Sequence, residues 1–150
     1  MASLFTKIID GQIPGRFVWA DDLCVVFLTI EPLTDGHAMV VAREEIEQWT
    51  DADDATWTHL QQVAKTIGQA QQAEWEVPRV GMLLEGFLVP HLHIHVWPAA
   101  SAADFDPHAT MSDVPDERFD AAAERLRERL RAMGHGEHVA GPGPLAPATG

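Results

Sequence analysis

The apolar residues in the first third of the chain follow the patterns of β-strands. Residues 16–20 and 23–28 are rich in Val, Phe and Trp, and the acidic pair 21–22 between them predicts a hairpin. After a polar break over residues 32–36, residues 37–42 have the composition of a third strand. Three strands in series before any helix indicate an antiparallel meander.

Two longer segments have helical spacing. From residue 51 to about residue 75, apolar residues recur every three or four positions, which predicts an amphipathic helix that Pro78 closes. A second helix is expected over residues 115–133, with Pro115 in its first turn and Gly134 at its end.

Between these helices, residues 80–84 and 91–97 predict two more strands, joined by a connector short enough for a hairpin. The pattern therefore indicates one α+β domain over residues 1–134, in which the two main helices cover one face of a five-stranded antiparallel sheet. Residues 135–150 are rich in Gly and Pro and poor in apolar side chains, so we expect a disordered tail there.

The charge of the chain restricts its partners. Ten Lys and Arg against 23 Asp and Glu give a net charge of −13, which repels polyanions and argues against a nucleic-acid partner. Any phosphate must then be held locally, by backbone N–H groups, helix ends or imidazoles.

Cys24 is the single cysteine, which excludes an internal disulfide and a Cys-x-x-Cys zinc site. We interpret it as a small buried apolar side chain. The first twenty residues lack the apolar run of a signal peptide, and no stretch of the chain approaches a membrane span. These features predict a cytoplasmic protein without a membrane partner.

Three histidines alternate with apolar residues at His91, His93 and His95. The period of two in a strand sends the three imidazoles to one face and the intervening apolar side chains to the core. His93 then lies centrally, with an imidazole on each side of it.

This arrangement is compatible with two kinds of chemistry. A neutral imidazole can attack phosphorus, while its neighbours donate hydrogen bonds to the charge that develops on the phosphoryl oxygens. Three imidazoles on one strand face could equally bind zinc with an open catalytic position. His37 could supply a fourth imidazole, whereas we expect the other four histidines to be solvated: His59, His108, His135 and His138.

The segment His91 to Trp97 resembles the motif His-φ-His-φ-His-φ-φ of the histidine-triad (HIT) superfamily, where φ is apolar. The resemblance extends to residues 4–14, to residues 27–32 and to the Gly36-His37 pair, and covers roughly residues 3–100.

The resemblance implies a homodimer with a five-stranded sheet in each subunit, which hydrolyses or transfers nucleoside monophosphate groups. His93 matches the nucleophile that forms a covalent nucleotidyl-histidine, and His95 matches the residue that contacts the phosphate. His91 and His37 match the supporting imidazoles. The implied ligand is a nucleotide, and neither a metal nor another cofactor is required.

The resemblance also assigns a nucleotide pocket and exposes departures from the family pattern. The apolar wall for the base is matched by Phe5, Ile8, Phe27 and Ile30. Many family members have an Asp for the ribose hydroxyls where this chain has Thr29, and often an Asn where it has Leu84. Residues 87–90 replace the usual Gly-Gln-Ser/Thr segment that receives the leaving group.

Two functions of different classes follow from the sequence. The first is a hydrolase or nucleotidyl transferase that acts at a P–N or P–O bond through His93. The second is a nucleotide-binding or phosphate-binding protein of the same fold with little turnover, suggested by Thr29, Leu84 and the changed segment at 87–90. A metalloenzyme with histidine ligands is a third alternative.

Overall fold

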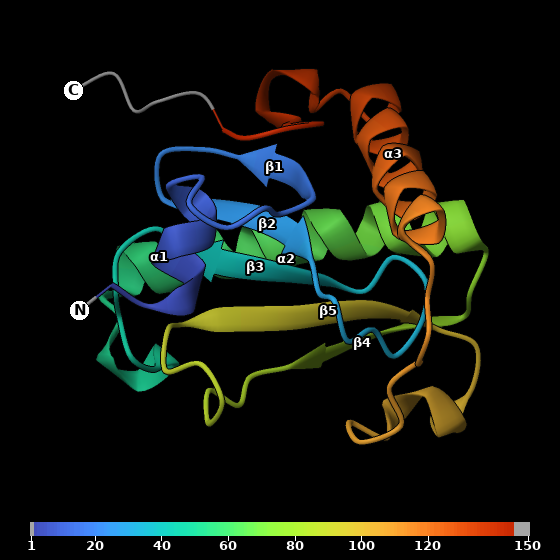
Figure 1. Cartoon of the computed structure of the whole chain (residues 1–150), viewed down its shortest axis with the longest axis horizontal. Coiled ribbons are helices and arrows are strands. Elements are labelled where there is room, and N and C mark those ends of the chain that lie inside the picture. The colour runs from blue at the N-terminus through green and yellow to red at the C-terminus, as the bar shows by residue number, and fades with distance from the viewer. Residues whose placement is uncertain (1, 146–150) are drawn as a thin grey trace.

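Five strands form one antiparallel sheet in the computed structural model, which describes residues 2–145 (Figure 1). The spatial order is β1-β2-β3-β5-β4, so the meander and the later hairpin predicted from the sequence are joined through a β3–β5 pairing. Because β5 is inserted between β3 and β4, the histidines at its start lie inside the sheet rather than at its edge. The strands are β1 (Phe17–Ala20), β2 (Cys24–Leu28), β3 (Ala38–Ala42), β4 (Arg79–Leu83) and β5 (His93–Ala99).

The two predicted long helices are present as α2 (Asp54–Trp75) and α3 (Asp116–Ala132), and both pack on the same face of the sheet. Asp53 caps α2 by accepting a hydrogen bond from the backbone N–H of Thr56. The apolar residues that alternate with the histidines point into this core, as the alternation predicts: Leu92, Ile94 and Val96. Among the helices that the structure describes, none combines the length and hydrophobicity needed to cross a bilayer.

A third helix, α1 (Leu4–Ile9), lies on the opposite face of the sheet (Figure 1). Phe5 and Ile8 of α1 are buried against a second core cluster formed by the strands. The sequence pattern did not predict this element because six residues are too few to establish a helical period. The sheet is therefore covered on both faces, with the triad on the α1 face.

The start of β5 differs from the prediction. The structure begins the strand at His93, and His91 lies in the turn before it. Leu92 pairs irregularly, since its N–H donates to Ile46 and its carbonyl accepts from Ala42. The predicted strand over residues 91–97 was wrong by two residues at this end. Nevertheless His91 remains on the α1 face, where its ring contacts Phe5.

Part of the predicted tail is ordered against the domain. Residues 136–138 form a short 3-10 helix, Val139 forms a bridge with Trp19, and Arg127 donates a hydrogen bond to the carbonyl of Ala140. The composition of residues 135–145 does not reveal these contacts, because their partners belong to β1 and α3. Residues 146–150, the rest of that prediction, lie outside the described residues.

Candidate functional site

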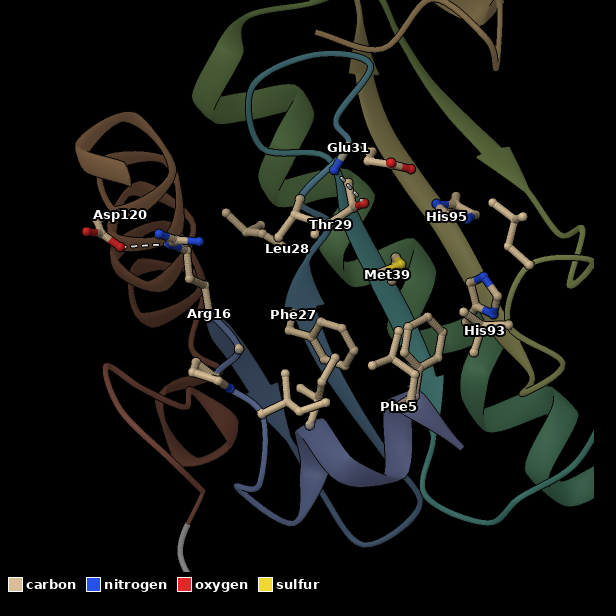
Figure 2. Close-up of a pocket in the computed structure, with 18 of the residues that line it drawn as sticks. Phe5, Arg16, Phe27, Leu28, Thr29, Glu31, Met39, His93, His95 and Asp120 are labelled. Atoms are coloured by element: carbon tan, nitrogen blue, oxygen red, sulfur yellow. Dashed lines mark hydrogen bonds and ion pairs between the residues drawn. The ribbon is translucent and has the colours of Figure 1, made fainter. Parts of the chain in front are cut away.

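A cavity of about 1030 Å³ opens on the α1 face of the sheet. Figure 2 shows His93 and His95 on one side of it, with Phe5 and Phe27 below them and Arg16 and Asp120 at the far end. Seven of the residues predicted for the site line this cavity: Phe5, Ile8, Phe27, Thr29, Ile30, His93 and His95. The structure therefore brings most of the predicted site together from α1, β2, β5 and the loop after β2.

One hydrogen bond determines which ring nitrogen of His93 carries the proton and which has a free lone pair. Nδ1 of His93 is 2.6 Å from the backbone carbonyl oxygen of His91. A carbonyl can only accept, so Nδ1 carries the proton, and Nε2 of the neutral ring is left unprotonated. The edge contact with Phe5, at 4.8 Å between ring centroids, holds the ring in place.

His91 does not line the cavity but lies behind His93, fully buried. Its Nε2 donates to the carbonyl of Ala42 at 2.6 Å, and its Nδ1 is 2.6 Å from the hydroxyl of Ser3. Ser3 is also the N-cap of α1, and Glu45 accepts from the backbone N–H of Ser3. Both ring nitrogens of His91 are therefore engaged, and its carbonyl is positioned to orient His93.

A hydrogen bond from His37 determines which ring nitrogen of His95 carries the proton. The backbone N–H of Leu33 donates to Nδ1 of His37 at 3.0 Å, so a neutral His37 carries its proton on Nε2. That proton points to Nδ1 of His95, 2.9 Å away. A neutral His95 then has its own proton on Nε2. His93 and His95, with ring centroids 4.9 Å apart, thus present an unprotonated nitrogen and an N–H donor side by side.

The surroundings of the imidazoles favour their neutral forms. Burial lowers the pKa of His93. Burial, followed by the proximity of His93, lowers the pKa of His95 to about 4. Burial and the neighbouring His95 lower the pKa of His37 to about 3. At neutral pH these three rings are uncharged, which is the state needed for a nucleophile and for the tautomers described above.

The far end of the cavity contains polar residues that the sequence pattern did not reveal. Arg16 pairs with Asp120 of α3 at 2.8 Å, and Arg127 is buried with hydrogen bonds to the carbonyls of Phe17 and Ala140. These residues come from segments far apart in the chain, so no local motif identifies them. Pro142 and Gly143 complete this wall, which places the ordered part of the tail next to the ligand space.

Thr29 is buried at the edge of the cavity, and its Oγ1 accepts a hydrogen bond from the backbone N–H of Glu31 at 3.1 Å. Its hydroxyl proton remains available for a ligand. Ile30 is 78% exposed and forms the rim rather than an apolar wall. Leu84 packs against the main core instead of lining the cavity, so the structure gives no support to its predicted contact with a nucleotide.

The loop between β4 and β5 covers the cavity beside His93. Glu85, Gly86, Phe87, Leu88 and Val89 all line the opening. Phe87 and Leu88 are almost fully exposed, at 87% and 89%. This loop occupies the position at which the resemblance expects the leaving group to be received.

The three alternating histidines are poorly arranged as a metal site. A metal ligand needs a nitrogen lone pair directed at the ion. His91 uses Nε2 as a donor and Nδ1 as an acceptor from Ser3, and it turns away from the cavity. Only Nε2 of His93 faces the cavity with a lone pair, because Nδ1 of His95 is occupied by His37.

Comparisons with known proteins point to one family. Residues 10–102 match the model of the HIT domain. An uncharacterized HIT-like protein of Methanocaldococcus jannaschii is 29% identical over 99 residues, which is 63% of this chain and 77% of that protein. The adenosine 5'-monophosphoramidase of Schizosaccharomyces pombe is 27% identical over 99 residues, covering 65% and 74%.

The fold is also similar to that of solved structures. A hypothetical histidine triad nucleotide-binding protein of Sulfolobus tokodaii superposes with a TM-score of 0.76 at 22% sequence identity. The superposition covers 86% of this chain and 92% of that chain. It confirms the five-stranded α+β architecture expected from the sequence.

Proposed function

This chain belongs to the HIT domain family, and from that premise we propose that it is a hydrolase or nucleotidyl transferase acting through a covalent nucleotidyl-histidine at His93. The substrate class is a nucleoside monophosphoryl group linked through a P–N or P–O bond. The observation that carries the proposal is the 2.6 Å hydrogen bond from Nδ1 of His93 to the carbonyl of His91. It leaves the lone pair of Nε2 free on a cavity-lining side chain.

In the first step, Nε2 of His93 attacks the phosphorus and forms a P–N bond. The bond to the leaving nitrogen or oxygen breaks, and the leaving group takes up a proton from solvent. As the ring becomes positively charged, its Nδ1–H keeps the hydrogen bond to His91, which stabilises that charge. The N–H of His95 donates to a non-bridging oxygen, where negative charge develops.

In the second step, water or an acceptor hydroxyl attacks the same phosphorus. The attacking water or hydroxyl releases a proton to solvent, the P–N bond to His93 breaks, and the ring regains its lone pair. A nucleoside monophosphate or its ester is released. Glu45, Ser3 and His91 take no part in bond breaking in this scheme, but they hold the orientation of His93.

Two further observations support a nucleotide as ligand. Phe5 and Phe27 form an edge-to-face pair, at 5.5 Å between ring centroids, on the floor of the cavity. Such a surface suits the flat face of a base. The relative in Schizosaccharomyces pombe is named for phosphoramidase activity toward an adenosine 5'-monophosphate derivative.

The test is turnover of adenosine phosphoramidates and dinucleoside polyphosphates, followed by chromatography of the released nucleoside monophosphate. We expect turnover by the wild-type chain and a loss of at least about a thousandfold in His93→Asn. His108→Gln, which removes an exposed histidine outside the cavity, is the matched control and should retain full activity. Equal turnover by wild type and His93→Asn would overturn the proposal.

Binding with little turnover is the second candidate, and the loop at residues 85–89 favours it. Phe87, Leu88 and Val89 of this loop present apolar side chains where the resemblance expects the leaving group to be received. For a pure binding protein, calorimetry would show nucleotide affinity in both wild type and His93→Gly, with no product from either.

We also propose a homodimer, in keeping with the resemblance. β4 forms an edge of the sheet, and Met82 on that strand is 57% exposed. An exposed strand edge with an apolar side chain is a surface that a second copy can cover. Light scattering during gel filtration would contradict this proposal by giving the mass of a monomer across micromolar concentrations.

A further inference from the structure

A second group of chemically reactive side chains lies at the turn between β1 and β2. Asp21 is in the turn, Cys24 begins β2, and His59 projects from α2. Oδ2 of Asp21 is 2.7 Å from Nε2 of His59 and 3.5 Å from Sγ of Cys24. Cys24 is buried, as we expected of a small apolar side chain, and His59 was expected to be solvated. The structure brings both side chains to one carboxylate.

The carboxylate of Asp21 is ionised and fixed in orientation. Its Oδ1 accepts from the backbone N–H groups of Leu23 and Cys24, both at 2.9 Å, and its Oδ2 accepts from Nε1 of Trp19 at 2.8 Å. Although burial opposes ionisation, the hydrogen bonds from Trp19, His59 and the backbone lower the pKa of Asp21 to about 2. Hydrogen bonds of this kind orient the ligands of metal sites.

The donor set matches the preferences of zinc. Thiolate sulfur, imidazole nitrogen and carboxylate oxygen are its usual ligands, at about 2.3, 2.0 and 2.1 Å. Two ligands on a tetrahedral ion at these distances are about 3.4 to 3.6 Å apart. The sulfur–oxygen distance of 3.5 Å already fits, and His59 needs to withdraw by about 0.7 Å from Asp21.

A second cavity, of about 600 Å³, gives access to the group. Asp21 and His59 both line it, together with His135 and His138 from the ordered part of the tail. The side chain of His59 is 32% exposed, so it can move without disrupting the core. An ion between the three donors would be open to solvent on the side of this cavity.

We propose that Asp21, Cys24 and His59 bind a borderline-soft divalent cation, with Zn²⁺ the best match, and that the fourth coordination position opens into the second cavity. The ion replaces the hydrogen bonds that now join Asp21 to His59 and to Cys24. The thiol of Cys24 releases its proton to solvent, and the proton of His59 moves to Nδ1. This site is separate from the triad and does not depend on the proposed catalytic function.

Burial and the nearby Asp21 raise the pKa of the Cys24 thiol. A bound dication reverses this effect, because it stabilises the thiolate directly. Binding therefore releases a proton, and the affinity for the metal should rise with pH through the neutral range.

Titration with Co²⁺ tests the proposal selectively. Cys24 is the only cysteine, so a thiolate-to-cobalt charge-transfer band can come from no other site, including the imidazoles of the triad. We expect one equivalent of Co²⁺ to produce this band and Zn²⁺ to abolish it by displacement. His59→Gln should weaken the affinity at least about tenfold, while His93→Asn and His108→Gln should leave the band unchanged.

Absence of the charge-transfer band at saturating Co²⁺ would overturn the proposal. An unchanged affinity in His59→Gln would also overturn it, since the ion would then use other ligands. Cys24→Ser should lose the band, and His59→Gln provides the decisive comparison if the serine variant fails to fold. Circular dichroism of each variant verifies the fold before titration.

Discussion

The buried, neutral rings of His37 and His95 predict a specific loss of stability in mild acid. In an unfolded chain, His37 and His95 take up protons with a pKa of about 6.5. In the folded chain the pKa values are about 3 and about 4. Below pH 6.5 the unfolded state therefore binds more protons than the folded state, so stability is complete above this pH and decreases as the pH falls.

The size of the effect follows from these pKa values. Each histidine contributes a slope of about 1.4 kcal/mol per pH unit once the unfolded state is protonated. Between pH 7.5 and pH 5.5, the two together should lower the free energy of unfolding by about 2 to 3 kcal/mol. The pKa values of Asp21, Glu74 and Glu124 are also lowered, but carboxylates titrate closer to pH 4, below this window.

Urea denaturation at pH 7.5, 6.5 and 5.5 measures this change. The double variant His37→Gln/His95→Gln should have a flatter dependence on pH by the same 2 to 3 kcal/mol, whatever its stability at pH 7.5. His108→Gln, which removes an exposed histidine, is the matched control and should follow the wild type. The reasoning is refuted if the double variant keeps the full pH dependence, or if NMR titration finds either ring protonated at pH 6.5.

Three substitutions test other parts of the account. Thr29→Asp supplies a charged acceptor at the buried edge of the cavity. By calorimetry, this variant should bind adenosine monophosphate about ten- to a hundredfold more tightly than the 2'-deoxy analogue. Equal affinities of the variant for the two nucleotides would contradict a ribose contact at this position. Gly81→Ala places a Cβ 2.3 Å from the buried ring of Trp97, so thermal unfolding should show a free energy of unfolding lower by about 1 to 3 kcal/mol. Gly136→Ala is the control: its Cβ meets nothing closer than 3.9 Å, and its stability should stay close to that of the wild type. Arg127→Met removes the side chain that donates to the carbonyls of Phe17 and Ala140. We expect the free energy of unfolding to fall by about 2 to 4 kcal/mol and the KM for the nucleotide substrate to rise. If neither quantity changes, the tail does not support the cavity wall.

Much of the fold could be predicted from the sequence because its signals are local. The helical spacing of residues 54–75 and the alternation around Ile94 and Val96 each reflect burial of one face. Helix α1 could not be predicted in this way, since it is short and its burial depends on the sheet beneath it. The contacts of Val139 and Ala140 could not be predicted for a similar reason, because their partners Trp19 and Arg127 are distant in the sequence.

In the candidate site, too, the sequence identified some residues but could not predict the contacts between distant segments. Alternation identified His93 and His95, and the resemblance added His37, which proves to lie 2.9 Å from His95. The orientation of His93 by a backbone carbonyl has no signature in side-chain identity, since any residue at position 91 has a carbonyl. Nor could the sequence place Asp21 and Cys24 beside His59, because that contact depends on how α2 lies against the β1–β2 turn.

Direct detection of the covalent intermediate tests the central claim. The wild-type chain is mixed with an adenosine phosphoramidate, quenched within milliseconds at a pH that preserves phosphoramidate bonds, and analysed by intact-mass and peptide mass spectrometry. We predict an increase equal to one adenylyl group, located on His93 and absent in His93→Asn. Turnover without any adduct on His93, or an adduct on another residue, would contradict the account.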